Sequence, residues 1–286
     1  MSYQYIKPKT IEQAIDAMQQ YPAYHLLAGG TDLLVKMKLG RIVAGTFIDI
    51  SELKELQQLT VDNGTITIGA AVTHTQISSS PYIMEFAPAL AAASASVGSP
   101  QIRNRGTIGG NSGNASPAGD TIPALMAYAA VVDIVGAEGV RTIPLNEFFT
   151  GPGRTVLKSD ELILKFSFSA QQAREGSAFE KLGKRKALAI SIVNAASFIA
   201  VDANQTVTQA RIALGSVAAT PLRITTAEKT LIGRKLTDRV IVEAAKTAAD
   251  SVNPIDDVRS EADYRKKMVA VLTQRTLENS RSFLCL

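Results

Sequence analysis

Two short segments, each with a pair of adjacent glycines, are the part of this sequence best suited to hold an anionic ligand. They read Leu26-Leu27-Ala28-Gly29-Gly30-Thr31-Asp32-Leu33 and Thr107-Ile108-Gly109-Gly110-Asn111. Glycine lets backbone N–H groups turn toward one point without a Cβ in the way, and the first segment also begins a predicted helix. Two such loops would hold a diphosphate without lysines, although either one alone is equally typical of a tight turn.

Other phosphate-binding and nucleophile motifs fail on their spacing. The segment around Gly29 lacks the G-x-G-x-x-G pattern of a dinucleotide-binding turn, and Ala178 stands where a phosphate loop ending at Gly183-Lys184 needs its first glycine. The segment Gly110–Gly113 is one residue short of the G-x-S-x-G nucleophile elbow. Neither a nucleoside triphosphatase nor a serine hydrolase is therefore indicated.

The chain is poor in the side chains that usually carry redox or metal chemistry. Its 286 residues include two His, one Cys and no Trp, with 30 Lys and Arg against 26 Asp and Glu. A single cysteine excludes a disulfide framework and an iron–sulfur cluster or multi-cysteine zinc site held by this chain alone. The net charge of +4 is too small to indicate nucleic-acid binding. Redox work here would need a cofactor to supply the reactive group.

The histidines, the cysteine and the location of the protein follow from similar considerations. His25 and His74 lie in no motif with a partnering acid or nucleophile, so we interpret both as structural, and Cys285 in the C-terminal tail receives no role. No apolar run reaches the roughly 18–20 residues that span a bilayer, and the N-terminus has no signal-peptide core. We expect a reduced, cytoplasmic location.

Residues 1–57 predict a small α/β unit that positions the first glycine pair. A strand over 25–28, a helix over 32–39 and a strand over 46–50 follow one another closely, which is typical of a parallel strand pair. The glycines then lie where the first of these strands turns into the helix.

Residues 58–170 carry the second glycine pair. Asn63-Gly64 predicts a hairpin, a helix rich in Ala and Ser is expected over 87–97, and further helix and strand signals follow from residue 121 to residue 168. Residues 98–118 look irregular, and so long a loop in a compact domain is typically functional. After a polar linker, residues 177–286 show three strands followed by three helices, which indicates an α+β module with a sheet covered on one face.

The two glycine motifs together resemble a known family. LLAGGTDLL (26–34) and PQIRNRGTIGGNSGNASPAGDTIPAL (100–125) are similar to the FAD-binding medium subunit of the molybdenum hydroxylases, which include xanthine dehydrogenase and aerobic carbon monoxide dehydrogenase. The similarity extends to GPGRT (151–155), to FEKLGKRKALAIS (179–191) and to the whole length. It implies an α+β fold: two α/β subdomains of the vanillyl-alcohol-oxidase (PCMH) type, over 1–57 and 58–170, and a C-terminal α+β module over 177–286 with an antiparallel sheet and helices.

The resemblance also implies a set of FAD-binding residues. Both glycine motifs, 26–33 and 107–111, would bind the pyrophosphate and its neighbourhood, and Asp120 matches a carboxylate near the ribose and adenine. Leu162 matches an apolar FAD contact, and Lys181 a lysine near the flavin, although an alignment anchored at Phe179 places Glu180 there instead. From the residues alone, Asp120 would equally cap the helix that follows it, Leu162 would be core and Lys181 a solvated side chain.

The activity implied by the resemblance is electron transfer within a complex. A large molybdopterin subunit would oxidise the substrate, a small subunit with [2Fe–2S] clusters would carry single electrons, and the FAD on this chain would pass them to NAD or another acceptor. A xanthine dehydrogenase is the family member we expect; carbon monoxide, N-heterocycle and aldehyde dehydrogenases are the alternatives. In this reading, Lys184, Arg185 and Lys186 would attract an anionic acceptor such as NAD and stabilise reduced flavin.

Two other functions stay open at this point. A stand-alone FAD oxidoreductase of the same fold, such as a cell-wall precursor reductase, would need its own catalytic Ser, Glu and Tyr, which we cannot place in the sequence. An assembly protein would use the glycine pairs only as turns. The medium subunit of 4-hydroxybenzoyl-CoA reductase resembles this chain but carries an additional cysteine-rich insertion, which this sequence lacks.

Overall fold

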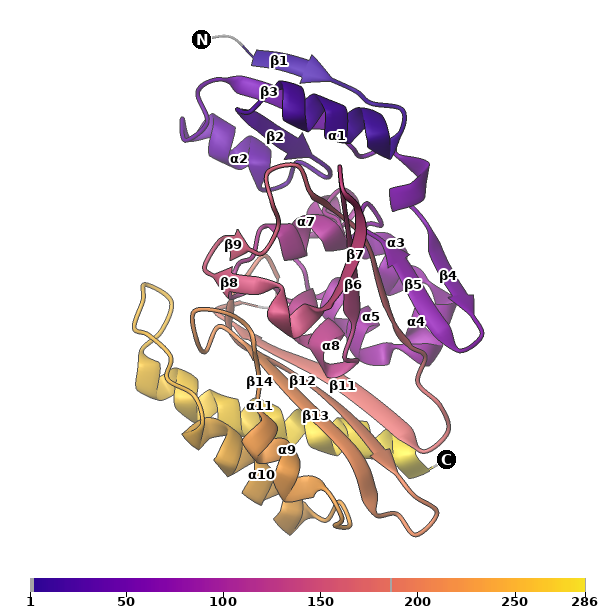
Figure 1. The fold of residues 1–286 in the computed structure, drawn as a ribbon. Helices are drawn as coiled ribbons and strands as arrows, with labels where there is room; N and C mark the ends of the chain where they lie inside the picture. The colour runs from indigo at the N-terminus through magenta and orange to yellow at the C-terminus, as the bar shows by residue number, and fades with distance from the viewer. Residues whose placement is uncertain (1–2, 186, 286) are drawn as a thin grey trace.

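The computed structural model describes residues 3–185 and 187–285, and its three main sheets follow one another along the chain. Figure 1 shows the N-terminal unit at one end of the molecule, the second unit in the middle and the C-terminal module at the other end. Both predicted glycine motifs lie near the junction of the first two units.

The N-terminal unit is a three-stranded parallel sheet with the strand order β1-β3-β2. Its elements are β1 (Tyr3–Ile6), α1 (Ile11–Gln20), β2 (Tyr24–Leu27), α2 (Leu33–Lys38) and β3 (Gly45–Asp49). Helix α1 begins where Thr10 accepts a hydrogen bond from the Gln13 backbone, and it buries one apolar face. The predicted parallel pair is confirmed, because Leu26 of β2 lies opposite Ile48 of β3.

The second unit is built on a five-stranded antiparallel sheet with the order β4-β5-β10-β6-β7. The strands are β4 (Leu59–Asp62), β5 (Thr65–Gly69), β6 (Val131–Gly136), β7 (Gly139–Pro144) and β10 (Leu162–Ser169), with a separate small hairpin of β8 (Phe149–Gly151) and β9 (Arg154–Thr155). Asn63 and Gly64 have φ values of 47° and 72°, as the tight turn of a hairpin requires, so the hairpin prediction is confirmed.

Short helices connect the strands of the second unit. They are α3 (His74–Ser79), α4 (Pro81–Phe86), α5 (Pro88–Ala95), α6 (Pro100–Arg103), α7 (Ile108–Gly113) and α8 (Thr121–Ala127), with 3-10 turns at Lys54–Leu56 and Leu145–Glu147. The prediction that residues 98–118 are irregular was wrong, because α6 and α7 both lie there. Each begins at a side-chain cap: Ser99 accepts from the Ile102 backbone and Thr107 from the Gly110 backbone.

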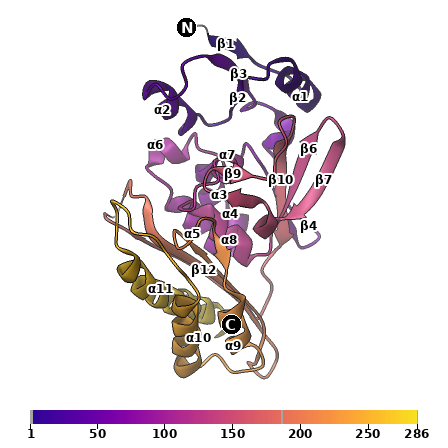
Figure 2. The ribbon, with the colours of Figure 1, turned by 60° about the vertical axis from the view of Figure 1, so that its left-hand side comes forward.

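The C-terminal module is a four-stranded antiparallel sheet with three helices on one face (Figures 1 and 2). It consists of β11 (Glu175–Gly183), β12 (Ser191–Val201), β13 (Val207–Gly215), β14 (Leu222–Arg223), α9 (Thr225–Leu231), α10 (Asp238–Asp250) and α11 (Ala262–Ser282), followed by a 3-10 turn at Phe283–Cys285. The predicted α+β organisation is confirmed.

Helices of the second unit cover the other face of this C-terminal sheet. Helix α5 packs on β11, and α8 packs on β12 and β13, so β12 is buried along all 11 of its residues. Tyr128 at the end of α8 stacks on Phe168 and exchanges a hydrogen bond with Ser177 of β11. The second unit and the C-terminal module therefore share a core. Within the described residues, no helix has the length and apolar character needed to cross a membrane.

Candidate functional site

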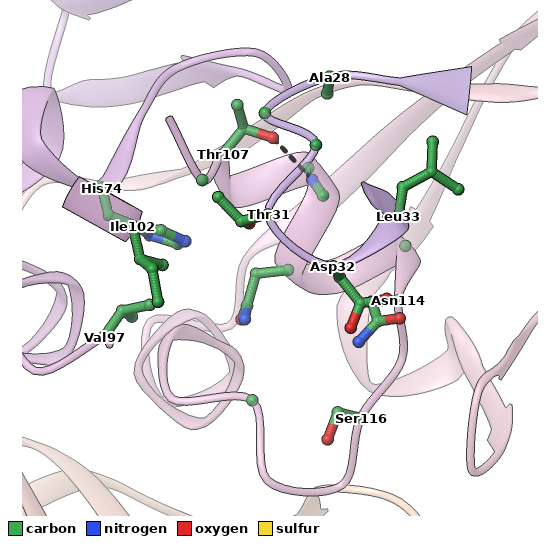
Figure 3. Close-up of a pocket in the computed structure, with 18 of the residues that line it drawn as sticks. Ala28, Thr31, Asp32, Leu33, His74, Val97, Ile102, Thr107, Asn114 and Ser116 are labelled. Atoms are coloured by element: carbon green, nitrogen blue, oxygen red, sulfur yellow. Dashed lines mark hydrogen bonds between the residues drawn. The ribbon is translucent and has the colours of Figure 1, made fainter. Parts of the chain in front are cut away.

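A cavity of about 610 Å³ lies where the first two units meet, and the C-terminal module adds part of its wall. Figure 3 shows the loop after β2, with Ala28, Thr31 and Asp32, close to Thr107 at the start of α7, while His74, Val97, Ile102, Asn114 and Ser116 lie around the same cavity. The predicted site residues in its lining are Leu26, Ala28, Gly29, Gly30, Thr31, Asp32, Leu33, Thr107, Gly109, Gly110, Asn111, Asp120 and Leu162. Leu27, Ile108 and Lys181 are outside the lining; Ile108 is fully buried, and Lys181 contacts the lining residue Asp120.

The first glycine motif approaches the second motif's loop without any space between them. A Cβ on Gly29 would lie 1.9 Å from the carbonyl oxygen of Arg105, so only glycine fits at this position. In the described part of the chain, the backbone N–H groups of Gly29, Gly30 and Thr31 donate no hydrogen bond. Because a backbone N–H rarely stays unpaired, these groups are available to an anion in the cavity.

The second glycine motif works differently from the sequence-based expectation. The N–H of Gly109 donates to the Ala70 carbonyl at 2.9 Å, and the N–H of Gly110 donates to Thr107 Oγ1 at 3.0 Å. The expectation that this motif also turns free N–H groups toward the ligand was therefore wrong, because α7 and its cap already use them. Glycine is needed at 109 for packing: a Cβ there would lie 2.5 Å from the Cβ of Ala70.

The two aspartates that precede helices do not cap them with their side chains. Asp32 instead forms an ion pair with Lys36, Oδ2 to Nζ 2.6 Å, and Lys36 also donates to Asn114 Oδ1 at 3.0 Å. Asp120 faces the C-terminal module. The reading of Asp120 as a helix cap was thus wrong in its geometry, and its carboxylate has other partners.

The Asp120 carboxylate is surrounded by three donors from β11 and β12. Lys181 Nζ lies 2.5 Å from Oδ2, and Ser191 Oγ and Asn194 Nδ2 donate to Oδ1 at 2.6 and 3.0 Å. Lys181 Nζ also donates to the carbonyl of Ser96 at 3.0 Å. The ion-paired side chains are 12% and 8% exposed, so solvent screens the pair only weakly.

The alternation of side chains along β11 separates Lys181 from Glu180. Lys181 points to Asp120 at the cavity, whereas Glu180 accepts a hydrogen bond from Asn279 of α11, on the opposite face of the sheet. Of the two residues that the sequence left open, Lys181 is the one on the cavity side.

The basic segment after β11 reaches the cavity rim through its apolar end. Lys184 donates to the carbonyl of Val258, Arg185 donates to the carbonyl of Leu188, and both side chains are exposed. Lys186 lies outside the described residues. Leu188, Ala189 and Ile190, which sequence reasoning did not single out, line the cavity. The attraction of an anionic acceptor by Lys184 and Arg185 stays a prediction.

His74 also lines the cavity, although sequence reasoning treated it as structural. It is 2% exposed, and burial, reinforced by the positive charge of Arg103, lowers its pKa to about 4. Its neutral imidazole is turned into the cavity (Figure 3). The Thr73–Gln76 capping box that starts α3 was visible in the sequence, but nothing in the sequence places this helix start beside the first glycine motif.

Comparison with known proteins agrees with this arrangement. Residues 1–168 match the FAD binding domain in molybdopterin dehydrogenase, and residues 177–280 match the CO dehydrogenase flavoprotein C-terminal domain. The nicotinate dehydrogenase FAD-subunit of Eubacterium barkeri is 37% identical over 274 residues, which cover 93% of this chain and 92% of that protein. The putative xanthine dehydrogenase FAD-binding subunit of Escherichia coli strain K12 is 32% identical and covers 96% of this chain and 95% of that protein.

A solved structure supports the same assignment. The carbon monoxide dehydrogenase from Hydrogenophaga pseudoflava contains a chain that superimposes with a TM-score of 0.94 at 32% identity, covering 99% of this chain and 98% of that one. These comparisons confirm both the resemblance drawn from the glycine motifs and the α+β FAD-binding fold. The chain belongs to the family of FAD-binding subunits of the molybdopterin dehydrogenases.

Proposed function

We propose that FAD binds in the cavity between the first two units, held by the residues of the two glycine motifs together with Asp120, Leu162 and Lys181. The observation that carries this proposal is that residues of both glycine motifs line the same cavity as the Asp120 cluster, which consists of Asp120 and its donors Lys181, Ser191 and Asn194. The residues fit the cofactor chemically. Unpaired N–H groups of the first motif suit the diphosphate, and Leu162, 1% exposed within the protein core, supplies apolar contact.

Within this site the two glycine motifs have different tasks. Gly29, Gly30 and Thr31 offer their N–H groups to the negative charge of the diphosphate. Gly109 and Gly110 act by being small: a Cβ on Gly109 would lie 2.5 Å from the Cβ of Ala70, and one on Gly110 would lie 2.9 Å from Thr107 Oγ1, so glycine lets α7 lie directly against the cavity wall. Asp120, with three donors around it, keeps its carboxylate in one orientation, which suits a hydrogen bond to a ribose hydroxyl.

We further propose that the chain is the electron-transferring medium subunit of a molybdenum hydroxylase complex. FAD supplies a redox centre able to take up electrons singly and give them up as a pair. The electrons would come from [2Fe–2S] clusters of a small partner subunit, and a large molybdopterin subunit would oxidise the substrate. NAD is the acceptor we expect, with other acceptors as the alternative. The cytoplasmic location also stays a prediction.

The substrate of the complex follows from the partner subunit rather than from this chain. The relatives named above act, by their names, on nicotinate, xanthine and carbon monoxide, and their identities to this chain range only from 32% to 37%. We propose, as from the sequence, that the complex is a xanthine dehydrogenase. A nicotinate-type N-heterocycle is the second candidate, favoured by the 37% identity.

Purification of the chain with its native partners tests these proposals. We expect a yellow complex with flavin, iron and molybdenum, whose flavin is bleached by substrate and restored by NAD. Assays with xanthine, nicotinate, carbon monoxide and an aldehyde then select the substrate. A yellow chain that purifies without iron or molybdenum and reduces its own substrate would instead establish a stand-alone oxidoreductase. A chain with no affinity for FAD would contradict the proposed site.

A further inference from the structure

His74 is a cavity-lining residue that neither glycine motif includes. It is the first residue of α3, and its backbone N–H donates to the Gly106 carbonyl at 3.0 Å. This bond ties the start of α3 to the segment that leads into α7. The side chain is 2% exposed, so the fold holds it in place.

The two ring nitrogens of His74 are in different environments. Nδ1 is fully buried and has no hydrogen-bond partner. Nε2 has no hydrogen-bond partner among the described residues either, but unlike Nδ1 it is not a fully buried atom, and the ring to which it belongs lines the cavity. A buried polar group without a partner costs stability, and such groups in native proteins commonly serve a ligand.

The chemistry of the ring determines what it offers to a ligand. A neutral imidazole carries one N–H donor and one acceptor nitrogen. A proton on Nδ1 would create a buried N–H with no acceptor, whereas a proton on Nε2 points into the cavity. The ring therefore presents an N–H donor to the cavity.

The position of this donor relates it to the first glycine motif. A Cβ on Gly106 would lie 3.3 Å from Cδ2 of His74, the atom bonded to Nε2, and 3.4 Å from Oγ1 of Thr31. Both side chains thus meet at the same point of the cavity wall. The donors gathered there, together with the nearby charge of Arg103, suit a negatively charged ligand.

We propose that His74 is a further FAD-binding residue, whose Nε2–H donates a hydrogen bond to the diphosphate held by the first glycine motif. This inference rests on the FAD site proposed above. His74 acts there as a neutral donor that adds to the N–H groups of Gly29, Gly30 and Thr31 without adding charge.

Three substitutions separate the contribution of Nε2 from that of the ring as a whole. His74→Gln places an amide N–H near the position of Nε2, His74→Asn places one near Nδ1, and His74→Leu removes both. The full-length chain is stripped of flavin and titrated with FAD, with ADP, which contains the diphosphate, and with riboflavin, which lacks it. Thermal unfolding without ligand reports whether each variant is folded.

We expect wild type and His74→Gln to bind FAD with similar affinity. The dissociation constants of His74→Leu and His74→Asn for FAD and ADP should rise about 10- to 100-fold, the loss typical of a hydrogen bond to a charged group, while riboflavin binding is unchanged. Unchanged FAD affinity in His74→Leu, or an equal loss for riboflavin and FAD, would overturn the inference. A wild-type chain that binds no FAD would instead contradict the proposed site itself.

A measurement on the wild-type chain covers the case in which a variant does not fold. The ¹⁵N signals of the His74 imidazole report which nitrogen carries the proton and whether it is hydrogen-bonded. Addition of ADP should shift the Nε2 signal in the direction of a donating N–H and leave Nδ1 unprotonated. An Nε2 signal that ADP does not move would overturn the inference.

Discussion

Lys181 and Asp120, which are 61 positions apart in the chain, form a nearly buried ion pair across the boundary between the second unit and the C-terminal module, with Nζ 2.5 Å from Oδ2. Two further hydrogen bonds, from Ser191 and Asn194, hold the carboxylate. Because Asp120 lies at the wall of the cavity, the position of β11 and β12 and the shape of the cavity depend on each other.

Breaking this pair should destabilise the fold. Lys181→Met leaves the Asp120 carboxylate buried without its counter-charge. Asp120→Asn likewise leaves the Lys181 ammonium group buried without a counter-charge. We expect each substitution to lower the free energy of unfolding by about 3 kcal/mol. The double substitution should cost less than the sum of the two, because no uncompensated charge remains. Urea denaturation measures all three.

The exposed pair Lys158–Glu138 provides the control, since its side chains are 57% and 85% exposed. Lys158→Met should change the free energy of unfolding by less than about 1 kcal/mol. Equal effects at the buried and exposed pairs would show that the Asp120 cluster contributes no more than a surface ion pair.

Gly29→Ala tests the contact between the first glycine motif and Arg105, in the segment that leads into the second motif. The new Cβ would lie 1.9 Å from the carbonyl oxygen of Arg105, so the two loops must separate. Overpacking of this kind costs about 1–3 kcal/mol, and we expect FAD affinity to fall about 10- to 100-fold as the cavity distorts. Flavin fluorescence titration measures the affinity.

Gly151→Ala is the matched control, because its Cβ would lie 3.9 Å from Cδ of Arg154, an ordinary contact. It should leave FAD affinity unchanged. A Gly29→Ala protein with wild-type affinity would mean that the loops tolerate separation and that their close approach is not needed for binding.

His74 should make stability depend on pH. The imidazole stays neutral in the folded chain down to its pKa of about 4, while in the unfolded chain it takes up a proton near pH 6.5. Between these values the unfolded state binds more protons, so the free energy of unfolding falls as the pH falls, by about 3 kcal/mol in total. Below pH 4 the imidazole is protonated in both states, so His74 lowers the free energy of unfolding no further.

Urea denaturation of wild type and His74→Gln between pH 4 and pH 7 checks this behaviour. The variant should lose less stability over the interval, whatever its stability at pH 7. Parallel curves for the two proteins would show that the folded-state pKa of His74 is not lowered.

Arg265 should not be replaceable by lysine. Its guanidinium is 2% exposed and donates to the carbonyls of Ile192 and Ser216 at 2.9 and 3.1 Å and to Asp257 at 2.6 Å. The three acceptors are positioned to match the planar guanidinium group, and a single lysine ammonium group cannot reach all of them. Arg265→Lys should therefore lower the free energy of unfolding by about 3 kcal/mol.

Thermal or urea denaturation gives the comparison with Arg234→Lys, an exposed arginine paired with Glu243. That control should change stability by less than about 1 kcal/mol. If Arg265→Lys is as stable as the control, the buried guanidinium is not what joins α11 to the ends of β12 and β13.

Regular elements could be predicted from the sequence because their signals are local. The three strands expected at the start of the C-terminal module are present as β11, β12 and β13, and Asn63-Gly64 specifies its own turn. The segment 98–118 was misjudged because its glycines suggested a loop, while the caps Ser99 and Thr107 support two short helices.

The lining of the cavity could be predicted only where it consists of contiguous motifs. The positions of both glycine motifs and of Asp120 were visible in the sequence. Ser191 and Asn194 donate to Asp120 only because of how β12 is placed against the second unit. The place of His74 depends on the packing of Gly106 beside Thr31. Such relations between distant residues have no local pattern.

The partners of Asp120 bear on when the cofactor site is completed during biosynthesis. A ribosome releases the two glycine motifs and Asp120 well before Lys181, Ser191 and Asn194, and Arg265, which anchors the end of β13 through Ser216, emerges near the end of the chain. Since domains generally fold in the order of synthesis, the N-terminal units form first, with one wall of the cavity still missing. For the proposed binding of FAD in this cavity, we therefore expect stable capture only after release of nearly the whole polypeptide.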